Sequence, residues 1–146
     1  MKVKEYLDEN PKKVLTVTPD TQVQHAMTRL IENAISCLPV ESPQGELLGI
    51  ISDKDIFRAA HRSPGDFVEE KVSTLMTTDL IVGLPDDEFD YIAGVMTRNR
   101  IRHVPIVDRR RLIGLISVGD VVKSQLKSIE IENRYLKKYI TDSYPA

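Results

Sequence analysis

The sequence predicts a mixed α/β (α+β) fold in which two β-α-β-β-α repeats pack sheet to sheet and an extended helix follows at the C-terminus. An internal repeat and the same order of strand-like and helical segments in both copies predict this fold. Shifted by 66 residues, the chain matches itself at Pro19/Pro85, Asp20/Asp86, Asn33/Asn99, Ile35/Ile101 and Pro39/Pro105. Shifted by 65 residues, it matches at Gly49/Gly114, Ile51/Ile116, Ser52/Ser117 and Asp55/Asp120. Because one copy of about 60 residues buries too little apolar surface to be stable alone, we expect the copies to pack together.

Each copy is expected to begin with a short strand and a helix. The β-branched segments 14–17 and 80–82 are typical of strands. Thr18 is a favourable N-cap residue and Pro19 suits the first helical position, so the first helix is expected to start there. The second copy offers a poorer cap residue but more acidic side chains in the first turn, and apolar residues then recur with helical spacing in both copies.

A hairpin and a second helix complete each copy. Apolar segments around turns predict hairpins over 38–51 and 104–116, and Ser52 and Ser117 are expected to cap the helices that follow them. The predicted organisation is a first domain over 1–62, a linker over 63–71, a second domain over 72–125 and a helical extension over 126–146.

Composition excludes several classes of protein. The chain of 146 residues has a net charge of −2, which does not favour a dedicated nucleic-acid binder. Its single cysteine, Cys37, rules out an internal disulfide framework, and the three histidines have no metal-ligand spacing, so no metal site is expected. No apolar run is long enough to span a membrane and no signal region is present, which predicts a cytoplasmic protein. Cys37 has no motif-level base beside it, and no phosphate loop or nucleophile elbow occurs, so we do not expect an enzyme.

The Ser-x-x-Asp pattern that follows each hairpin is the strongest chemical signal. Ser52 and Ser117 lie at helix N-termini, where free backbone N–H groups and the helix dipole favour a phosphate. Asp55 and Asp120 stand one helical turn later and can accept hydrogen bonds from both hydroxyls of a ribose. A plain N-cap with a first-turn acid is the alternative interpretation of the same four residues.

Both copies resemble CBS domains (named for cystathionine β-synthase), and the tandem pair resembles a stand-alone Bateman module. The motifs that carry the resemblance are Cys37-Leu-Pro-Val with Gly49-Ile-Ile-Ser-Asp-Lys-Asp-Ile, and His103-Val-Pro-Ile-Val-Asp with Gly114-Leu-Ile-Ser-Val-Gly-Asp-Val. The resemblance covers about residues 1–125. It implies a pseudo-twofold CBS pair that regulates rather than catalyses, needs no cofactor, and binds AMP, ADP, ATP or S-adenosylmethionine, sometimes NAD, in clefts between the domains.

The resemblance also implies which residues line each cleft. One site comprises Asp120, Ser117, Arg102 and His103, with Ile35 opposite. The other comprises Asp55, Ser52, Ser36 and Cys37, with Ile101 opposite and Lys54 nearby. Because Arg102 and His103 can donate to a phosphate, we expect the Asp120 site to be the better nucleotide site.

The expected function is therefore a signal-transducing regulatory module that binds an adenosine ligand and passes its state to a dimer or an effector protein. The alternative is a degenerate pair with empty sites that acts as a dimerisation or interaction scaffold. A nucleic-acid surface on the arginines between residues 98 and 111 is a third interpretation, although a solvated face is favoured for most of them.

The C-terminal segment has a short heptad pattern. Its apolar seam runs through Val122, Leu126, Ile129, Asn133, Leu136 and Ile140. A core Asn133 would fix the register of a paired coiled coil, which favours a homodimer, parallel or antiparallel. An amphipathic helix lying on its own module is the alternative.

Overall fold

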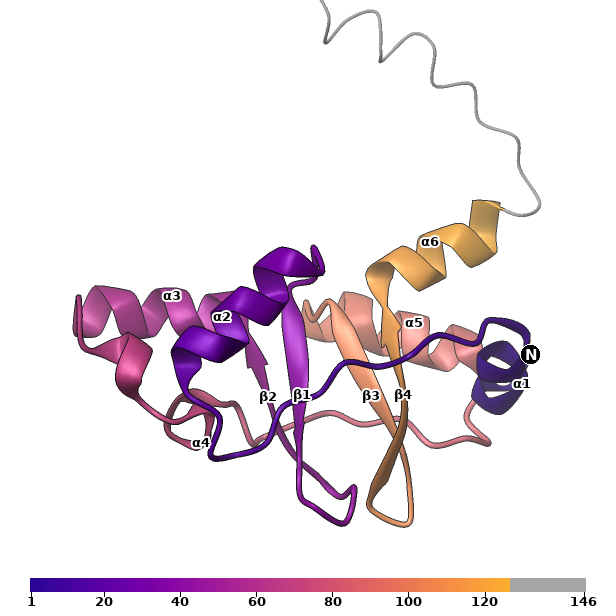
Figure 1. Cartoon of the computed structure of the whole chain (residues 1–146). Helices are drawn as coiled ribbons and strands as arrows, with labels where there is room; N and C mark the ends of the chain where they lie inside the picture. Colours follow the sequence, from indigo (N-terminus) through magenta and orange to yellow (C-terminus); the bar gives the residue numbers. More distant parts are fainter. Residues whose placement is uncertain (127–146) are drawn as a thin grey trace, which may run out of the picture.

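The computed structural model describes residues 1–126 and has the predicted mixed architecture. Figure 1 shows two strand pairs in the centre with helices on both outer sides. The elements are α1 (Val3–Glu9), α2 (Val23–Glu32), β1 (Cys37–Glu41), β2 (Leu47–Ser52), α3 (Asp53–Arg62), the 3₁₀ helix η1 (Phe67–Glu69), α4 (Val72–Leu75), α5 (Phe89–Asn99), β3 (His103–Asp108), β4 (Arg111–Ser117) and α6 (Val118–Leu126). The predicted extension beyond Leu126 and its heptad seam lie outside the described residues.

The two hairpins lie side by side and are joined at their turns. β1 pairs with β2 and β3 with β4, both antiparallel. The backbone N–H of Leu47 donates to the carbonyl of Arg110 at 3.0 Å, and that of Leu112 donates to the carbonyl of Gly45 at 3.1 Å. The predicted packing of one repeat's sheet beside the other's is therefore confirmed.

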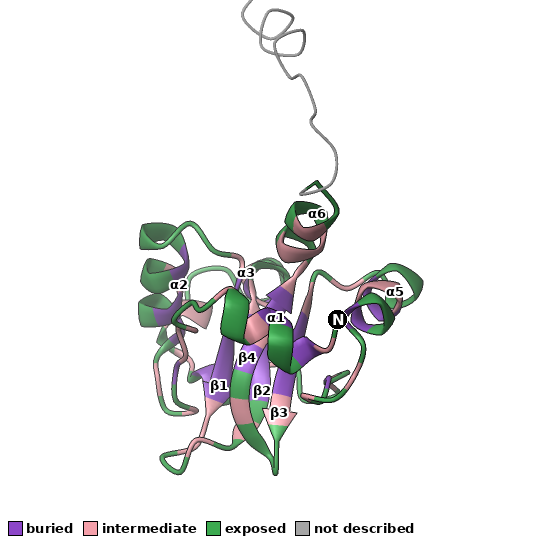
Figure 2. Ribbon diagram, turned by 90° about the vertical axis from the view of Figure 1, so that its right-hand side faces the viewer, coloured by how far each residue is buried: buried purple, intermediate pink, exposed green. Residues whose placement is uncertain are grey.

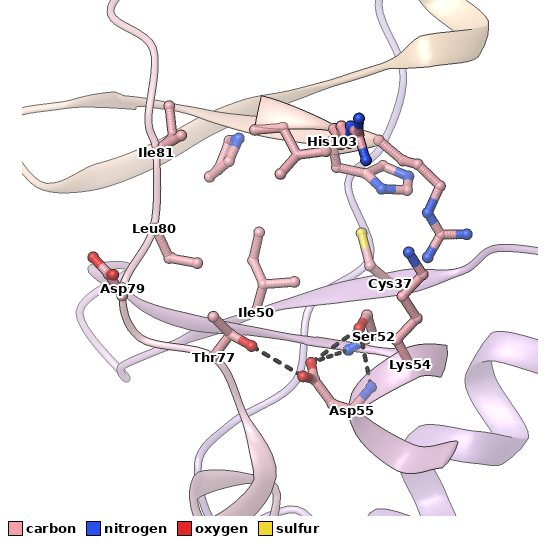
Figure 3. A pocket seen from close by; sticks show the side chains of 14 residues that line it. Cys37, Ile50, Ser52, Lys54, Asp55, Thr77, Asp79, Leu80, Ile81 and His103 are labelled. Atoms are coloured by element: carbon pink, nitrogen blue, oxygen red, sulfur yellow. Dashed lines mark hydrogen bonds between the residues drawn. The ribbon is translucent and has the colours of Figure 1, made fainter. Parts of the chain in front are cut away.

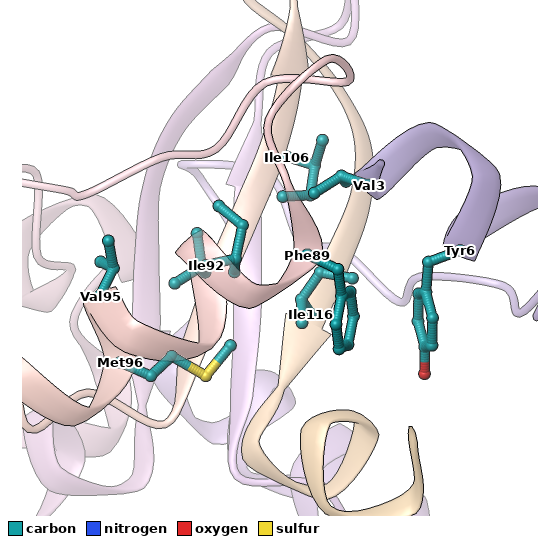
Figure 4. Packing of buried hydrophobic residues seen from close by; sticks show 9 residues of the cluster. Val3, Tyr6, Phe89, Ile92, Val95, Met96, Ile106 and Ile116 are labelled. Carbon is teal, nitrogen blue, oxygen red and sulfur yellow. The ribbon is translucent and has the colours of Figure 1, made fainter. Parts of the chain in front are cut away.

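Each repeat completes its hydrophobic core with a helix from elsewhere in the chain. Val3 and Tyr6 of α1 pack with residues of α5, β3 and β4, and the ring of Tyr6 lies 4.4 Å from that of Phe89 (Figure 4). Val72 of α4 is fully buried with residues of α2, α3, β1 and β2. The N-terminus thus closes the second repeat, and the segment after the first repeat closes the first.

Matching backbone contacts hold these two helices in place. The N–H of Val3 donates to Asp87 and that of Phe89 donates to Met1, at 2.9 Å each. In the other repeat, the N–H of Val72 donates to Thr21 and that of Val23 to Glu70, at 2.8 Å each. The pseudo-twofold relationship between the repeats therefore includes α1 and α4.

Two local structures differ from those that the sequence predicts. Segments 14–17 and 80–82 do not form strands, and the chain there makes only the isolated bridges of Val17 with Val40 and of Gly83 with Ile106. The predicted N-cap at Thr18 is also wrong, because α2 begins after Gln22. The reason is tertiary: Gln22 is held extended by a bridge to Lys71, while Thr18 closes a turn with Thr21.

Burial follows the strands and the helix faces that cover them (Figure 2). α6 differs from the other long helices, since none of its residues is buried and Val122 and Leu126 are 45% and 39% exposed. Within residues 1–126, no helix combines the length and apolarity needed to cross a bilayer.

Candidate functional site

Ser52 and Asp55 form a reciprocal capping box at the start of α3, as the sequence predicts for the cap. The Asp55 N–H donates to Ser52 Oγ at 3.3 Å, and the Ser52 N–H donates to Asp55 Oδ2 at 2.8 Å. Thr77, which follows α4, donates its hydroxyl to the other carboxylate oxygen, Asp55 Oδ1, at 3.0 Å. The carboxylate is thereby fixed in one orientation.

The first amides of α3 already have partners inside the protein. The Asp53 N–H donates to the carbonyl of Ser36 at 2.9 Å, the Lys54 N–H to Asp53 Oδ1 at 2.8 Å and the Asp55 N–H to Ser52 Oγ. The sequence-based expectation of free amides for a phosphate is therefore wrong at α3. An anion at the start of α3 would therefore have to be bound by side chains.

Ser117 and Asp120 repeat the capping arrangement at α6. The Ser117 N–H donates to Asp120 Oδ2 at 2.7 Å, and the Asp120 N–H donates to Ser117 Oγ at 3.1 Å. Here Lys12, which follows α1, places its ammonium 3.1 Å from Asp120 Oδ2. Burial by itself would raise the pKa of Asp120, but the hydrogen bonds from Ser117 and the charge of Lys12 bring that pKa below its ordinary value.

A pocket lies between the two repeats in front of Asp55 (Figure 3). Ser52, Lys54, Asp55 and Thr77 line one side, and the rest of the lining combines apolar side chains from both repeats with the charged Asp79, Arg100 and Arg102. The apolar residues are Ile50, Leu80, Ile81, Ile101 and Pro105. The pocket therefore combines a fixed carboxylate, cations and apolar walls.

Arg102 lies beside this pocket rather than beside Asp120. Its guanidinium donates to Asp53 Oδ1 at 2.7 Å, which joins the start of β3 to the start of α3 across the two repeats. The hydrogen bond from Arg102 lowers the pKa of Asp53 despite the opposing effect of burial. Arg102, which the sequence analysis assigned to the Asp120 site, thus lines the Asp55 pocket and binds Asp53.

A second pocket lies on the opposite side of the pseudo-twofold axis, near Ser117. It is larger, with a cavity volume of about 500 Å³ against about 220 Å³ for the Asp55 pocket. Its walls include Ile35, Ser36, Cys37, His103 and Ser117, with Lys12 and Lys13 at one side. Asp120 does not line it, and faces a separate hollow with Tyr6, Lys12 and Lys123.

Cys37 and His103 line both pockets, so they form the wall between them. Burial raises the pKa of the Cys37 thiol to about 12, which keeps it neutral. Burial and the nearby charges of Arg102 and Lys12 lower the pKa of His103 below its ordinary value of 6.5. Among residues 1–126, no group of three or more His, Cys, Asp or Glu side chains could hold a metal ion.

The structure groups the predicted residues differently from the sequence analysis. Asp55, Ser52, Lys54, Cys37 and Ile101 meet at one pocket, whereas Ser36, which the resemblance assigns to the same site, lines the other pocket. For the other predicted site, only Ser117, His103 and Ile35 meet, without Asp120 and Arg102.

Sequence reasoning missed Thr77, which contacts the carboxylate of Asp55, and Lys12, which contacts that of Asp120. A weaker signal existed: shifted by 69 residues, Val3 falls on Val72 and Leu7 on Met76. This third shift aligns α1 with α4, and it draws attention to the residues that follow these two helices.

Comparison with known proteins agrees with this arrangement. A family-wide profile of the CBS domain matches residues 3–62 and 72–127. The chain belongs to the CBS domain family. The CBS domain-containing protein YhcV of Bacillus subtilis is 30% identical over 115 residues, which cover 79% of this chain and 81% of that protein.

Solved CBS pairs have the same fold. A CBS domain pair of protein MJ0100, in complex with 5'-methylthioadenosine and S-adenosyl-L-methionine, has a TM-score of 0.75 and 27% identity, covering 88% of this chain and 98% of that chain. CBSX2 in complex with AMP has a TM-score of 0.78 and 25% identity, covering 88% and 99%. The chain also matches several curated enzymes but spans only 22% of their length, so the match is to their CBS part.

Proposed function

We propose that this CBS pair is a regulatory module that binds an adenosine-containing ligand between its repeats and passes the bound state to a second copy or an effector protein. The observation that carries the proposal is the Asp55 pocket, where a fixed carboxylate faces a cavity walled by apolar residues of both repeats. The complexes of the related CBS pairs with AMP and with S-adenosyl-L-methionine support the same ligand class.

The residues of the pocket suit the parts of an adenosine. Oδ2 of Asp55 already accepts from the N–H and the hydroxyl of Ser52, but Oδ1 accepts only from the hydroxyl of Thr77, so Oδ1 keeps an acceptor position for a ribose hydroxyl. Ile50 from one repeat and Ile81 and Ile101 from the segments of the other provide apolar contact for a flat base. Because these residues come from both repeats, a ligand that contacts all of them stabilises one relative placement of the repeats.

The salt bridge between Arg102 and Asp53 offers a way to transmit binding. It directly links the start of β3 to the start of α3, and it lies at the edge of the Asp55 pocket. A ligand beside Lys54 changes the electrostatic potential at Arg102, so it changes the strength of this link between repeats. α6 begins directly after Ser117 and would carry the change toward Leu126 at its end.

The test is calorimetric titration of ligand-stripped protein with AMP, ATP and S-adenosylmethionine, comparing Asp55→Ala with Asp120→Ala. Both variants lose the paired capping contacts, and since Asp55→Ala also loses the hydrogen bond from Thr77 and Asp120→Ala the contact with Lys12, melting curves of both variants accompany the titration. Asp55→Ala is expected to weaken the binding of S-adenosylmethionine, which bears no phosphate, by about 30-fold or more, as for a lost charged hydrogen-bond acceptor, and Asp120→Ala by much less. Equal affinities of wild type and Asp55→Ala for S-adenosylmethionine would contradict the proposal.

A scaffold that pairs with a second copy is the second candidate function. An apolar hollow between α2 and α3 favours it, because Ile31 and Phe57 are each 76% exposed there. If this function holds instead, no adenosine ligand raises the melting temperature, and Phe57→Glu shifts the sedimentation coefficient from dimer to monomer.

A further inference from the structure

The two pockets differ in charge at corresponding positions. The chain that follows α4 contacts the carboxylate of Asp55 through the neutral Thr77, and Arg58 of α3 also lies 3.9 Å from this carboxylate, whereas the chain that follows α1 contacts Asp120 through the ammonium of Lys12. The first residue of the helix is the acidic Asp53 in α3 but the apolar Val118 in α6. The second residue of the helix differs as well, since Lys54 in α3 corresponds to Gly119 in α6, and Lys54 adds a cation to the Asp55 pocket.

Lys12 changes what the Ser117 pocket presents to a ligand. Its side chain is half exposed and lines both this pocket and the hollow that holds Asp120. The ammonium occupies the carboxylate that would otherwise accept a ribose diol. Since Lys13 also lines the pocket, and no carboxylate among the described residues does, the pocket presents positive charge.

Lys12 is available because the connection after α1 is longer. Six residues, 8–13, separate Leu7 from Val14, whereas three residues, 77–79, separate Met76 from Leu80. In the shorter connection, Thr77 is fixed by backbone hydrogen bonds of 2.8 and 2.9 Å with Ile50. The longer connection brings a long cationic side chain to the corresponding carboxylate.

Asp53 has the opposite effect on the Asp55 pocket. Its carboxylate accepts from the Lys54 N–H and from the Arg102 guanidinium, two donors that would otherwise serve an anion. The remaining lining charges are Lys54 and Arg100 against Asp55 and Asp79, so the pocket is close to neutral.

We propose that the two pockets sort ligands by charge: the Ser117 pocket takes a phosphate-bearing ligand through Lys12 and Lys13, and the Asp55 pocket takes an uncharged or cationic adenosine compound through its diol acceptor. The inference deepens the proposed function and rests on it for the adenosine part. Lys12 and Asp53 are the residues that determine this specificity.

The test is a set of site-resolved NMR titrations of ¹⁵N-labelled protein with adenosine, AMP and inorganic phosphate. The amides of Ile50 and Ser52 report the Asp55 pocket, and those of Leu115 and Ser117 report the other. The Ser117 pocket is expected to prefer AMP to adenosine by about tenfold or more and to respond to phosphate. The Asp55 pocket is expected to show no preference for AMP and no response to phosphate.

Exchanging the distinguishing residues should exchange the preferences. Lys12→Thr should reduce the AMP preference at the Ser117 pocket about fivefold, which corresponds to about 1 kcal/mol, and Lys12→Arg should retain it. Asp53→Val should raise the AMP preference of the Asp55 pocket by a similar factor. Melting curves of each variant establish that it is folded.

The outcomes separate the inference from the proposed function. Equal preferences at both pockets, or ratios unchanged by Lys12→Thr and Asp53→Val, would overturn the charge sorting while the adenosine function stands. If neither adenosine nor AMP binds but phosphate moves Leu115 and Ser117 in a Lys12-dependent way, the proposed function fails and the charge assignment stands. If adenosine, AMP and phosphate all fail to bind, both the charge sorting and the proposed function are wrong.

Discussion

Removing the side chain that anchors α4 should weaken one pocket and spare the other. Val72 is fully buried in the core of the first repeat, and Val3 is fully buried in the core of the second. Val72→Ala and Val3→Ala therefore remove the same two methyl groups from corresponding positions. Each methyl contributes about 0.8 kcal/mol of transfer free energy, and the remaining cavity adds to it, so each variant should lose about 2 kcal/mol of unfolding free energy.

The two variants should differ in where the structure loosens. Thr77 follows α4 directly, and its N–H donates to the carbonyl of Ile50 at 2.8 Å beside Asp55. Val72→Ala should therefore speed amide exchange at Thr77 and Ile50 and weaken binding at the Asp55 pocket. Val3→Ala should instead speed exchange at Phe89, whose N–H donates to Met1 at 2.9 Å.

Urea unfolding and amide hydrogen exchange measure these effects. For a chain of this size a loss of about 2 kcal/mol lowers the melting temperature by about 4–8 °C. The reasoning is refuted if Val72→Ala costs less than about 0.5 kcal/mol, or if Val3→Ala loosens the first repeat as much as the second.

Three further predictions concern Gly49 and Gly114 in the strands, the turn between β3 and β4, and His103 in the wall between the two pockets. Gly49→Ala should weaken adenosine binding more than Gly114→Ala in calorimetry, because a Cβ at Gly49 would lie 2.8 Å from the backbone oxygen of Thr77, whereas at Gly114 it meets only the end of the Leu7 side chain. Arg109→Asn with Arg110→Gly should raise the unfolding free energy by about 1–2 kcal/mol in urea titrations, since both arginines have left-handed φ values of 51° and 69°; an unchanged midpoint would contradict this. Because the folded state lowers the pKa of His103 below its ordinary 6.5, the unfolded chain binds the proton more readily, so stability should be complete above pH 6.5 and fall as the pH decreases below it. His103→Gln should flatten that decrease in unfolding experiments between about pH 5 and 7, and an identical slope would show that other groups cause it.

Much of the fold follows from local sequence patterns. The repeat, the two hairpins and the Ser52 and Ser117 caps depend on contacts between residues close in sequence, and the structure confirms them. The start of α2 at Val23 instead of Pro19 could not be predicted in this way. It depends on the carbonyl of Glu70, which comes from a distant part of the chain.

The composition of the pockets was harder to predict for the same reason. The motif placed Asp55, Ser52 and Cys37 together because they are adjacent in one repeat. It placed Arg102 with Ser117 because both belong to the second repeat, yet the long Arg102 side chain reaches a carboxylate of the other repeat at 2.7 Å. Asp53 comes near Arg102 only when the two repeats are packed together, so the partner of Arg102 could not be predicted from either repeat alone.

α1 precedes the first repeat but packs on the second, and α4 follows the first repeat and packs on it. This arrangement explains why a ligand in this protein would act on the relative placement of the repeats. The Asp55 pocket needs Thr77 and Leu80 from the chain after α4, Ile101 from the chain before β3, and Asp55 itself from α3. Neither repeat alone supplies all of these, so the binding-competent pocket exists only for a particular placement of one repeat on the other. A ligand can shift that equilibrium only by its preference for one placement, and by reciprocity a partner that favours the same placement must tighten ligand binding by the same factor. A partner or second copy that favours one placement through contacts with the outer helices would therefore be detected as a change in nucleotide affinity, even though it touches neither pocket.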